Sequence, residues 1–316
     1  MKLAILGTGL VALKLNEYLK NDGYLADIYS SRKNKKFLDY KELENNEYAV
    51  VFGCLDGEKT KEIYPKVKAK IFIDNSECFR LNKNCPLYIA GVNENIINKE
   101  TKLVANPNCV AIMLASFLMP FSKAFKIKKV IVNSLQAVSG MGQKAKDYFL
   151  MERSDFEYFD QDVTPRFSLN GELIQILDNV IPLVGEIEKD GISHEERKIS
   201  EELEKLIPNI EVATMCYRIP VLNGHTASLH ITLDENFDKN KVLRFIETKL
   251  NIKYIEICSL KESLKNSEDI YATRLKKDPY CPYGFFITLM SNNITIGAAY
   301  NSYRAFKKYE ESNKIL

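Results

Sequence analysis

The feature that most constrains the fold is a glycine-rich turn near the start of the chain. Residues 2–6 form a short apolar run, and the sequence GTGLVA follows directly over 7–12. Apolar residues then recur with near-helical spacing, which predicts strand, turn and helix in that order. Glycines at such a turn let backbone N–H groups approach a pyrophosphate, so this context favours a dinucleotide site over a purely structural turn.

The end of the next predicted strand indicates which dinucleotide is preferred. Residues 25–31 read as a strand that completes a βαβ unit, and the sequence there continues as Ser30-Ser31-Arg32-Lys33. An acidic residue at this place would hold a ribose 2′-hydroxyl, whereas hydroxyl and cationic groups suit a 2′-phosphate. NADP is therefore preferred over NAD. A solvated basic loop is the alternative, and we keep it for Lys35 and Lys36.

The order of predicted elements indicates two domains. Further strands at 49–54 and 70–76 continue the alternation of strand and helix, which predicts a parallel, doubly wound sheet. After Asn108 the pattern changes: 109–121 predict a buried helix that ends at Pro120, and 129–138 predict a strand. We expect an α/β protein with a Rossmann-type dinucleotide-binding domain over 1–108 and 295–316. A second, α+β domain is expected over 109–294.

Later elements of the second domain are also marked by local patterns. Residues 193–207 predict a helix in which Ser193 is the N-cap and Glu196 completes a capping box. Strands are expected over 212–221 and 226–233. The last apolar pattern, 297–312, predicts a helix that returns to the first domain.

Composition excludes several classes of partner. The formal net charge is only +2, so no positive field favours nucleic acid or a membrane surface. The longest apolar stretch after the first strand is shorter than the ~20 residues that span a bilayer. Seven cysteines occur without a CxxC pair or metal-like spacing, which favours a reducing, cytoplasmic setting and predicts no metal site.

Cys109 is the candidate nucleophile among these cysteines. It follows Asn106-Pro107-Asn108 and opens the predicted apolar helix, where the helix dipole would stabilise a thiolate. A buried core cysteine is the alternative at this position, and it is the default interpretation for the other six.

His225 is the candidate acid or base among three histidines. It follows Asn223-Gly224 between two predicted strands, where an imidazole could reach a cleft. A structural role is an equally good interpretation from the position alone. His230 lies inside an alternating strand and His194 at a charged helix start, so we expect both to be structural or solvated.

Six ordered blocks of sequence together resemble a known family. They are IDNSECFR (73–80), VANPNCVAI (104–112), SLQAVSGMG (134–142), NVIPLVGEIEKDGISHEERK (179–198), YRIPVLNGHTASLHI (217–231) and GAAYN (297–301). The chain resembles bacterial aspartate-semialdehyde dehydrogenases over nearly its whole length. Residues 143–172 and 239–277 match poorly.

The resemblance implies a role for each candidate residue. Cys109 would be the nucleophile, Gln136 its orienting partner and His225 the acid/base. Arg218 would clamp the substrate α-carboxylate bidentately, a task that suits a guanidinium. The remaining substrate-binding candidates are Asn108, Arg80 and Lys198 for phosphate, and Glu195 for the ammonium group. For Glu195 and Lys198, an exposed helix face with an ordinary i,i+3 charge pair is the alternative.

The resemblance also implies the cofactor contacts and the reaction. The implied contacts with NADP(H) are Gly7, Thr8, Gly9, Leu10, Val11, Ser31, Arg32, Asn75, Ser139, Gly140 and Asn301. The implied activity is NADPH-dependent reduction of L-aspartyl 4-phosphate to L-aspartate 4-semialdehyde by a homodimer or homotetramer. An N-acetyl-glutamyl-phosphate reductase and a non-catalytic interaction module are the alternatives. Glu195 disfavours the reductase, because a free ammonium group needs a carboxylate partner. The presence of Cys109, Gln136, Arg218 and His225 disfavours the non-catalytic module.

Overall fold

The structure is a computed structural model that describes residues 1–31, 36–159, 167–169 and 171–314. It divides into two compact units, which are described separately. Unit 1 comprises residues 1–112 and 294–316, and unit 2 comprises residues 113–293. The division falls inside helix α3 (Cys109–Ala124).

Unit 1 is built on a parallel five-stranded sheet in the order β2-β1-β3-β4-β5. Its strands are β1 (Leu3–Leu6), β2 (Ala26–Tyr29), β3 (Glu47–Gly53), β4 (Lys68–Asp74) and β5 (Leu103–Ala105). Strands β1, β3 and β4 end in consecutive buried residues, as expected for a sheet that is covered on both faces. The predicted doubly wound sheet is confirmed.

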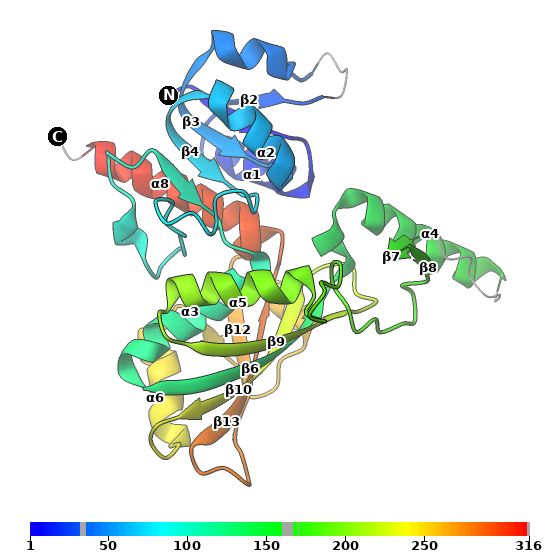
Figure 1. Ribbon diagram of the computed structural model, residues 1–316, viewed down its shortest axis with the longest axis vertical. Helices are drawn as coiled ribbons and strands as arrows, with labels where there is room; N and C mark the ends of the chain where they lie inside the picture. Colours follow the sequence, from blue (N-terminus) through cyan, green and yellow to red (C-terminus); the bar gives the residue numbers. More distant parts are fainter. Residues whose placement is uncertain (32–35, 160–166, 170, 315–316) are drawn as a thin grey trace. The chain divides into compact units, whose positions relative to one another are not determined.

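Helices cover both faces of this sheet. Helices α1 (Leu10–Asn21) and α8 (Tyr300–Lys314) share one core with the strands, in which Leu15 and Leu19 lie with Phe306 and Tyr309. Figure 1 shows α8 in red beside β4. The opposite face is covered by α2 (Gly57–Ile63) and by the 3-10 helix Tyr40–Asn45. Short helical turns at Tyr64–Lys66 and Glu94–Ile96 and a π-helix at Thr295–Ala299 complete the unit.

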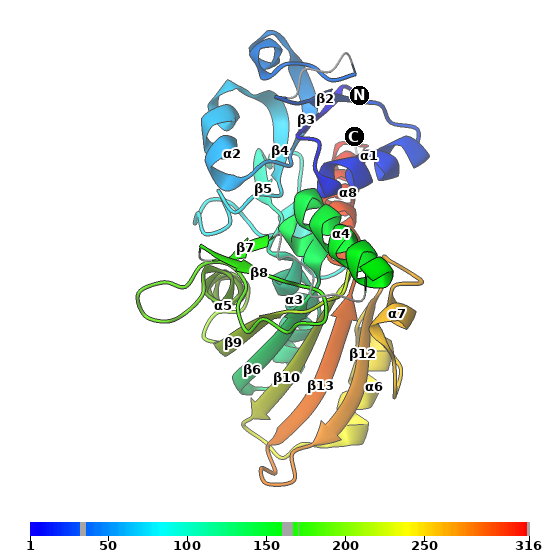
Figure 2. The same cartoon turned by 90° about the vertical axis from the view of Figure 1, so that its right-hand side faces the viewer.

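Unit 2 contains a mixed six-stranded sheet in the order β11-β12-β13-β10-β6-β9 (Figure 2). Its strands are β6 (Ile127–Gln136), β9 (Glu211–Arg218), β10 (His225–Leu233), β11 (Lys253–Tyr254), β12 (Ile270–Lys277) and β13 (Gly284–Ser291). The β6–β9 and β11–β12 pairs are parallel, and the other pairs are antiparallel. With the helices that pack on it, this sheet confirms the predicted α+β second domain.

Several helices pack against this sheet. Phe121 of α3 contacts Phe245 of α6 (Lys239–Lys249) and Phe285 of β13, with ring centroids 5.8 Å apart in each pair. Helix α5 (His194–Leu206) packs on β9, and α7 (Leu260–Ser263) packs on β13. The predicted capping box at the start of α5 is confirmed, since Ser193 and Glu196 exchange both of its hydrogen bonds.

The predicted end of α3 at Pro120 is wrong. The helix continues to Ala124 with the proline inside it. Stacked rings of Phe117, Phe121 and Phe125, with centroids 5.0 and 4.3 Å apart, hold the last turns against the core. Tertiary packing of this kind outweighs the loss of one backbone hydrogen bond.

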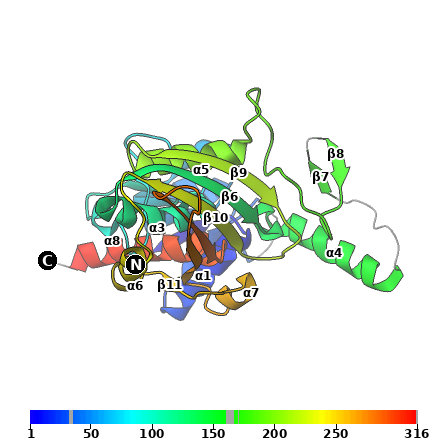
Figure 3. The same ribbon diagram turned by 90° about the horizontal axis from the view of Figure 1, so that it is seen from below.

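The first of the two segments that matched the family poorly lies in a projection of unit 2. It consists of α4 (Gln143–Phe159) and a hairpin of β7 (Phe167–Leu169) and β8 (Glu172–Ile174), seen together in Figure 3. Glu152 of α4 is buried, and its carboxylate accepts hydrogen bonds from the backbone N–H groups of Ile176 and Leu177 at 3.1 Å each. This carboxylate anchors the chain that leads back to the sheet.

No helix within the described ranges is both long and apolar enough to cross a membrane.

Candidate active site

Three of the predicted residues meet at one edge of the unit 2 sheet. Gln136 is the last residue of β6, Arg218 is the last of β9, and His225 is the first of β10. The parallel register pairs Gln136 with Arg218, and β10 runs antiparallel to β6, so that it begins where they end. All three side chains are buried, with exposed fractions of 2, 6 and 1% respectively.

The imidazole of His225 is held by the backbone that follows β6. The N–H of Ala137 donates to Nδ1 at 3.0 Å. Nε2 is buried and has no hydrogen-bond partner among the described residues. Burial, followed by the nearby Arg218 cation, lowers the pKa of His225 from 6.5 to about 3, although the Glu195 carboxylate and the Gly224 backbone act in the opposite direction. The imidazole is therefore neutral near pH 7.

Arg218 is fixed by the same backbone residue. Its Nη1 donates to the carbonyl oxygen of Ala137 at 2.6 Å, and its own backbone pairs with Ile181 in both directions. A Cβ atom on Gly140 would lie 3.2 Å from this Nη1 and 3.4 Å from Nε2 of His225. The glycine backbone thus passes close to both side chains and leaves room beside them.

Gln136 and α5 are joined through a buried carboxylate. The Gln136 amide nitrogen donates to Glu195 Oε1 at 3.3 Å, and Lys198 Nζ lies 3.2 Å from Glu195 Oε2. Glu195 is only 8% exposed, so the alternative of a solvated helix face does not describe it. The i,i+3 pair is real, but it faces the sheet and the side chain of Gln136.

Ser139 and Asn293 tie the following loop to the sheet. Ser139 Oγ hydrogen bonds to Asn293 Oδ1 at 3.1 Å, and the Gly224 N–H donates to the same oxygen at 2.9 Å. Asn293 is buried and fixes the turn that precedes His225. Sequence reasoning missed it, and its only local signal is an Asn-Asn pair after a strand.

In unit 1, the glycine-rich turn has the geometry that a dinucleotide pyrophosphate requires. Gly7 has φ +116°, and a Cβ there would lie 2.4 Å from the Cys54 carbonyl oxygen. Gly9 is the N-cap of α1 and makes no side-chain capping bond, and apart from its chain neighbours and the backbone of its own helix, no described atom lies within 4 Å of where its Cβ would be. The first backbone N–H groups of α1 are therefore accessible to an anionic ligand.

The other predicted cofactor contacts of unit 1 differ in exposure. Thr8, Leu10 and Val11 are half-buried at the start of α1, and Ser31 is exposed after β2. Arg32, on which the NADP preference partly depends, lies outside the described residues.

Cys109 is the first residue of α3 and is half-buried. Asn108 before it accepts hydrogen bonds at Oδ1 from the N–H groups of Val110, at 2.8 Å, and Ala111, at 3.3 Å. Asn108 therefore caps the helix, and the thiol lies at the positive end of the helix dipole. None of the seven cysteines, all within the described ranges, is in a disulfide.

Arg80 and three asparagines form a hydrogen-bonded network in unit 1. Arg80 donates from Nε to the Asn106 carbonyl at 2.9 Å and from Nη2 to the Asn75 carbonyl at 3.0 Å. Asn301 is fully buried; its amide nitrogen donates to the Tyr88 carbonyl and to Asn106 Oδ1, and its oxygen accepts from the Ala90 N–H. The asparagine amides thus hold the ends of β4, β5 and α8 together. Their contacts with cofactor stay predictions.

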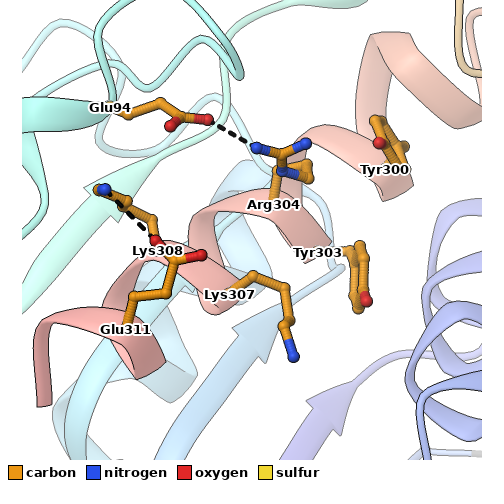
Figure 4. A pocket seen from close by; sticks show the side chains of 7 residues that line it. All are labelled: Glu94, Tyr300, Tyr303, Arg304, Lys307, Lys308 and Glu311. Atoms are coloured by element: carbon orange, nitrogen blue, oxygen red, sulfur yellow. Dashed lines mark hydrogen bonds and ion pairs between the residues drawn. The ribbon is translucent and has the colours of Figure 1, made fainter. Parts of the chain in front are cut away.

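A cavity of about 370 Å³ lies on α8, and its lining includes Tyr300, which precedes Asn301 in the GAAYN block. Figure 4 shows its lining, in which Arg304 pairs with Glu94 at 2.9 Å and Lys308 with Glu311 at 3.3 Å. Because these charges neutralise one another at the surface, the cavity is a solvated helix face rather than part of the candidate site. Over the described ranges, no group of three or more His, Cys, Asp or Glu side chains is arranged to hold a metal ion.

Family models match both parts of the chain. Residues 2–100 match the semialdehyde dehydrogenase NAD-binding domain, and residues 118–296 match the semialdehyde dehydrogenase dimerisation domain. The aspartate-semialdehyde dehydrogenase of Rickettsia conorii is 30% identical over 273 residues, which cover 83% of this chain and 79% of the relative. The chain belongs to the aspartate-semialdehyde dehydrogenase family.

Other members of the family match over similar lengths. The Bacillus subtilis aspartate-semialdehyde dehydrogenase is 29% identical over 261 residues, or 78% of this chain and 75% of the relative. Among solved structures, aspartate semialdehyde dehydrogenase II of Vibrio cholerae has a TM-score of 0.84 at 22% identity and covers 97% of each chain. The Candida albicans enzyme, solved with NADP, has a TM-score of 0.72 at 19% identity and covers 99% of each chain. These two structures show that the fold is shared.

Proposed function

We propose that this member of the aspartate-semialdehyde dehydrogenase family catalyses the NADPH-dependent reductive dephosphorylation of L-aspartyl 4-phosphate to L-aspartate 4-semialdehyde. This reaction serves the biosynthesis of lysine and diaminopimelate, threonine, methionine and isoleucine. The observation that carries the proposal is the buried cluster of Gln136, Arg218 and His225 at one sheet edge, with Glu195 beside it. Relatives named aspartate-semialdehyde dehydrogenase, which match most of the chain, support it.

Charged groups would bind the substrate at both ends. Arg218 would clamp the α-carboxylate, and Glu195 would face the ammonium group, which requires these two residues to be near each other. Both lie close enough to His225 to shift its pKa in opposite directions. Arg80, Lys198 and Asn108 would contact the phosphate end.

Cys109 would attack the acyl carbon, and the C–O bond to phosphate would break with its electron pair on the phosphate oxygen. This step leaves a thioester on the enzyme. The helix dipole at the start of α3 would favour the thiolate that this step needs. Gln136 would orient the nucleophile, and His225 would serve the carbonyl oxygen as charge develops on it.

The residues of unit 1 fit a dinucleotide. The accessible N-terminus of α1, approached through Gly7 and Gly9, would hold the pyrophosphate, and Ser31 with Arg32 would contact a 2′-phosphate. Asn75, Ser139, Gly140 and Asn301 are proposed as further contacts. When bound, NADPH supplies the hydride that reduces the thioester.

The open face of the unit 2 sheet supports a homodimer or homotetramer. Along β6, Lys129, Ile131 and Asn133 are exposed, whereas the residues between them are buried against the helices. Ile131 is 41% exposed, and Met215 on the neighbouring β9 is 45% exposed. We propose that a second copy covers this face, in agreement with the dimerisation-domain match. Ile131→Glu should then shift the mass measured by light scattering toward the monomer.

Two further assignments are part of the proposal. Seven cysteines without a disulfide are typical of the cytoplasm.

Buried Glu195 favours a substrate with a free ammonium group over an N-acylated one. Comparing turnover of L-aspartate 4-semialdehyde with that of N-acetyl-glutamate 5-semialdehyde would distinguish these two substrates.

The decisive experiment measures phosphate-dependent reduction of NADP by L-aspartate 4-semialdehyde, with NAD assayed in parallel. Wild-type protein should reduce NADP only when phosphate is present, and Cys109→Ala should be inactive. Near-native activity of Cys109→Ala, or no activity of correctly folded wild type, would contradict the proposal.

A further inference from the structure

The hydrogen bond from Ala137 determines which nitrogen of His225 carries a proton. A backbone N–H can only donate, so Nδ1, 3.0 Å away, must present its lone pair. In a neutral imidazole the other nitrogen then bears the hydrogen. Nε2 is that nitrogen, and it is buried with no partner in the described part of the chain.

The backbone at Ala137 is itself held in place. Its N–H binds His225, and its carbonyl oxygen accepts from Arg218 at 2.6 Å. The next two N–H groups, of Val138 and Ser139, donate to the carbonyl oxygens of Val221 and Leu222 at 2.8 and 3.0 Å. Ala137 is fully buried and extended, with φ −68°. The donor therefore cannot drift away from the ring without breaking these bonds.

The charges around the ring oppose its second protonation. A proton on Nδ1 would face the Ala137 N–H across 3.0 Å, and the Arg218 cation adds repulsion. The Glu195 carboxylate and the Gly224 carbonyl would favour the imidazolium, but burial outweighs them and the pKa is about 3. The ring is then a neutral donor at Nε2.

We propose that the backbone N–H of Ala137 holds His225 as the neutral tautomer protonated at Nε2, and that this Nε2–H donates a hydrogen bond to the reacting carbonyl oxygen. Ala137 is then a positioning residue. The second clause rests on the proposed function; the tautomer itself does not. Gly140, whose Cβ would lie 3.4 Å from Nε2, leaves room for that oxygen.

With a hydrogen-bond donor at Nε2, the thioester can be reduced to the aldehyde without any proton transfer by the ring. After hydride addition to the thioester, the carbonyl oxygen carries a negative charge that the donor stabilises. The electron pair on this oxygen then re-forms the C=O bond, and the C–S bond breaks with its pair on the Cys109 sulfur. Aldehyde and thiolate result, and the ring keeps its proton throughout.

Nitrogen-15 NMR of the unliganded protein tests the tautomer directly. The chain has only three histidines, so loss of one set of signals in His225→Gln assigns the ring. We expect a pyrrole-type Nε2 and a pyridine-type Nδ1 that do not change as the pH falls from about 8 to 5. A protonated Nδ1, which donation to the Gly224 carbonyl would produce, or a titration midpoint in this range would overturn the proposal.

Ala137→Pro tests the origin of the tautomer, because it replaces the donating N–H with the proline Cδ, which removes the hydrogen bond and displaces the imidazole that lies 3.0 Å away. Proline adopts the φ of −68° that Ala137 already has, and the preceding residue is in a strand, as proline prefers. We expect mixed tautomers, a raised imidazole pKa and a loss of about tenfold in kcat/KM that becomes pH-dependent. Ala137→Gly keeps the N–H and should keep the wild-type NMR pattern. A wild-type pattern in folded Ala137→Pro would refute the role of Ala137.

A third comparison remains informative if the proline variant does not fold. His225→Gln keeps a side-chain N–H donor but no base, whereas His225→Leu keeps neither. If Nε2–H is a donor, the glutamine variant should retain about tenfold more kcat than the leucine variant. Equal losses would contradict the donor role. If the protein shows the Nε2–H signal but has no dehydrogenase activity, the proposed function is refuted and the assignment of the tautomer still holds.

Discussion

Gly140 and Gly142 lie close together in one loop, and alanine at each would have a different effect. At one position it crowds the side chains of the site, and at the other it strains the backbone. Gly140 has no positive φ, but an added Cβ would lie 3.2 Å from Arg218 Nη1 and 3.3 Å from His225 Cε1. Gly142 has φ +89° and ψ −175°, and apart from its chain neighbours no described atom lies within 4 Å of an added Cβ. Alanine at these two positions therefore perturbs different quantities.

The expected effects follow from these distances. Because Arg218 is held by the Ala137 carbonyl at 2.6 Å, Gly140→Ala must displace a site side chain by a few tenths of an ångström. This displacement should lower kcat/KM about tenfold and cost about 1 kcal/mol of stability through overpacking. Gly142→Ala forces a backbone conformation that only glycine adopts readily, which costs about 1–3 kcal/mol. Its kcat/KM should stay within about twofold of wild type, because nothing in the site moves.

Two assays on each variant decide the matter. The phosphate-dependent NADP reduction gives kcat and KM for semialdehyde, and urea unfolding gives the stability. NADP(H) binding is titrated separately, since Gly140 is also a proposed cofactor contact. Wild-type kcat/KM in Gly140→Ala, or equal activity losses in both variants, would refute the interpretation that this glycine keeps room beside the imidazole and the guanidinium.

Three further predictions concern other buried groups. Because the pKa of His225 is lowered from 6.5 to about 3, the unfolded chain binds the proton more readily than the folded one. The free energy of unfolding should therefore fall by about 1–2 kcal/mol between pH 6.5 and 5, measured by urea unfolding, and by less in His225→Gln. Glu152→Ala removes the acceptor of the Ile176 and Leu177 N–H groups, the first of them buried, and should cost about 2–4 kcal/mol, with faster hydrogen exchange after the hairpin. The exposed Glu157→Ala should change stability by less than about 0.5 kcal/mol. Arg218→Lys loses the planar fork and should raise KM for semialdehyde about tenfold or more, and an unchanged KM would contradict the clamp.

Local patterns in the sequence predicted local structure well. The turn at Gly7 and Gly9 and the capping box of Ser193 and Glu196 depend on residues within a few positions of one another, and both are present. The end of α3 at Pro120 was wrong, because the stacked phenylalanines that extend the helix act against a distant strand and helix. Propensity alone does not include such contacts.

The electrostatics of the candidate site depend on register and were therefore not predictable from local sequence. The Ala137 N–H and His225 Nδ1 are 88 positions apart along the chain and meet only because β10 pairs with β6 in one register. Asn293, which holds the turn before His225, is 69 positions from Gly224. Sequence identified Gln136, Arg218 and His225 as members of one site, but not which of their atoms donate and which accept.

The mixed sheet explains why a histidine at the start of a strand can face residues at the ends of two others. Parallel β6 and β9 bring Gln136 and Arg218 to one edge, and a third parallel strand would have entered from the opposite edge. Because β10 is antiparallel, its first residue lies at this edge, next to the backbone that leaves β6. Beyond the end of β6, the N–H and the carbonyl oxygen of Ala137 do not pair with a neighbouring strand. The N–H donates to His225, and the carbonyl oxygen accepts from Arg218. A single peptide segment thus fixes a neutral donor beside a cation, and neither side chain can turn without disturbing the other.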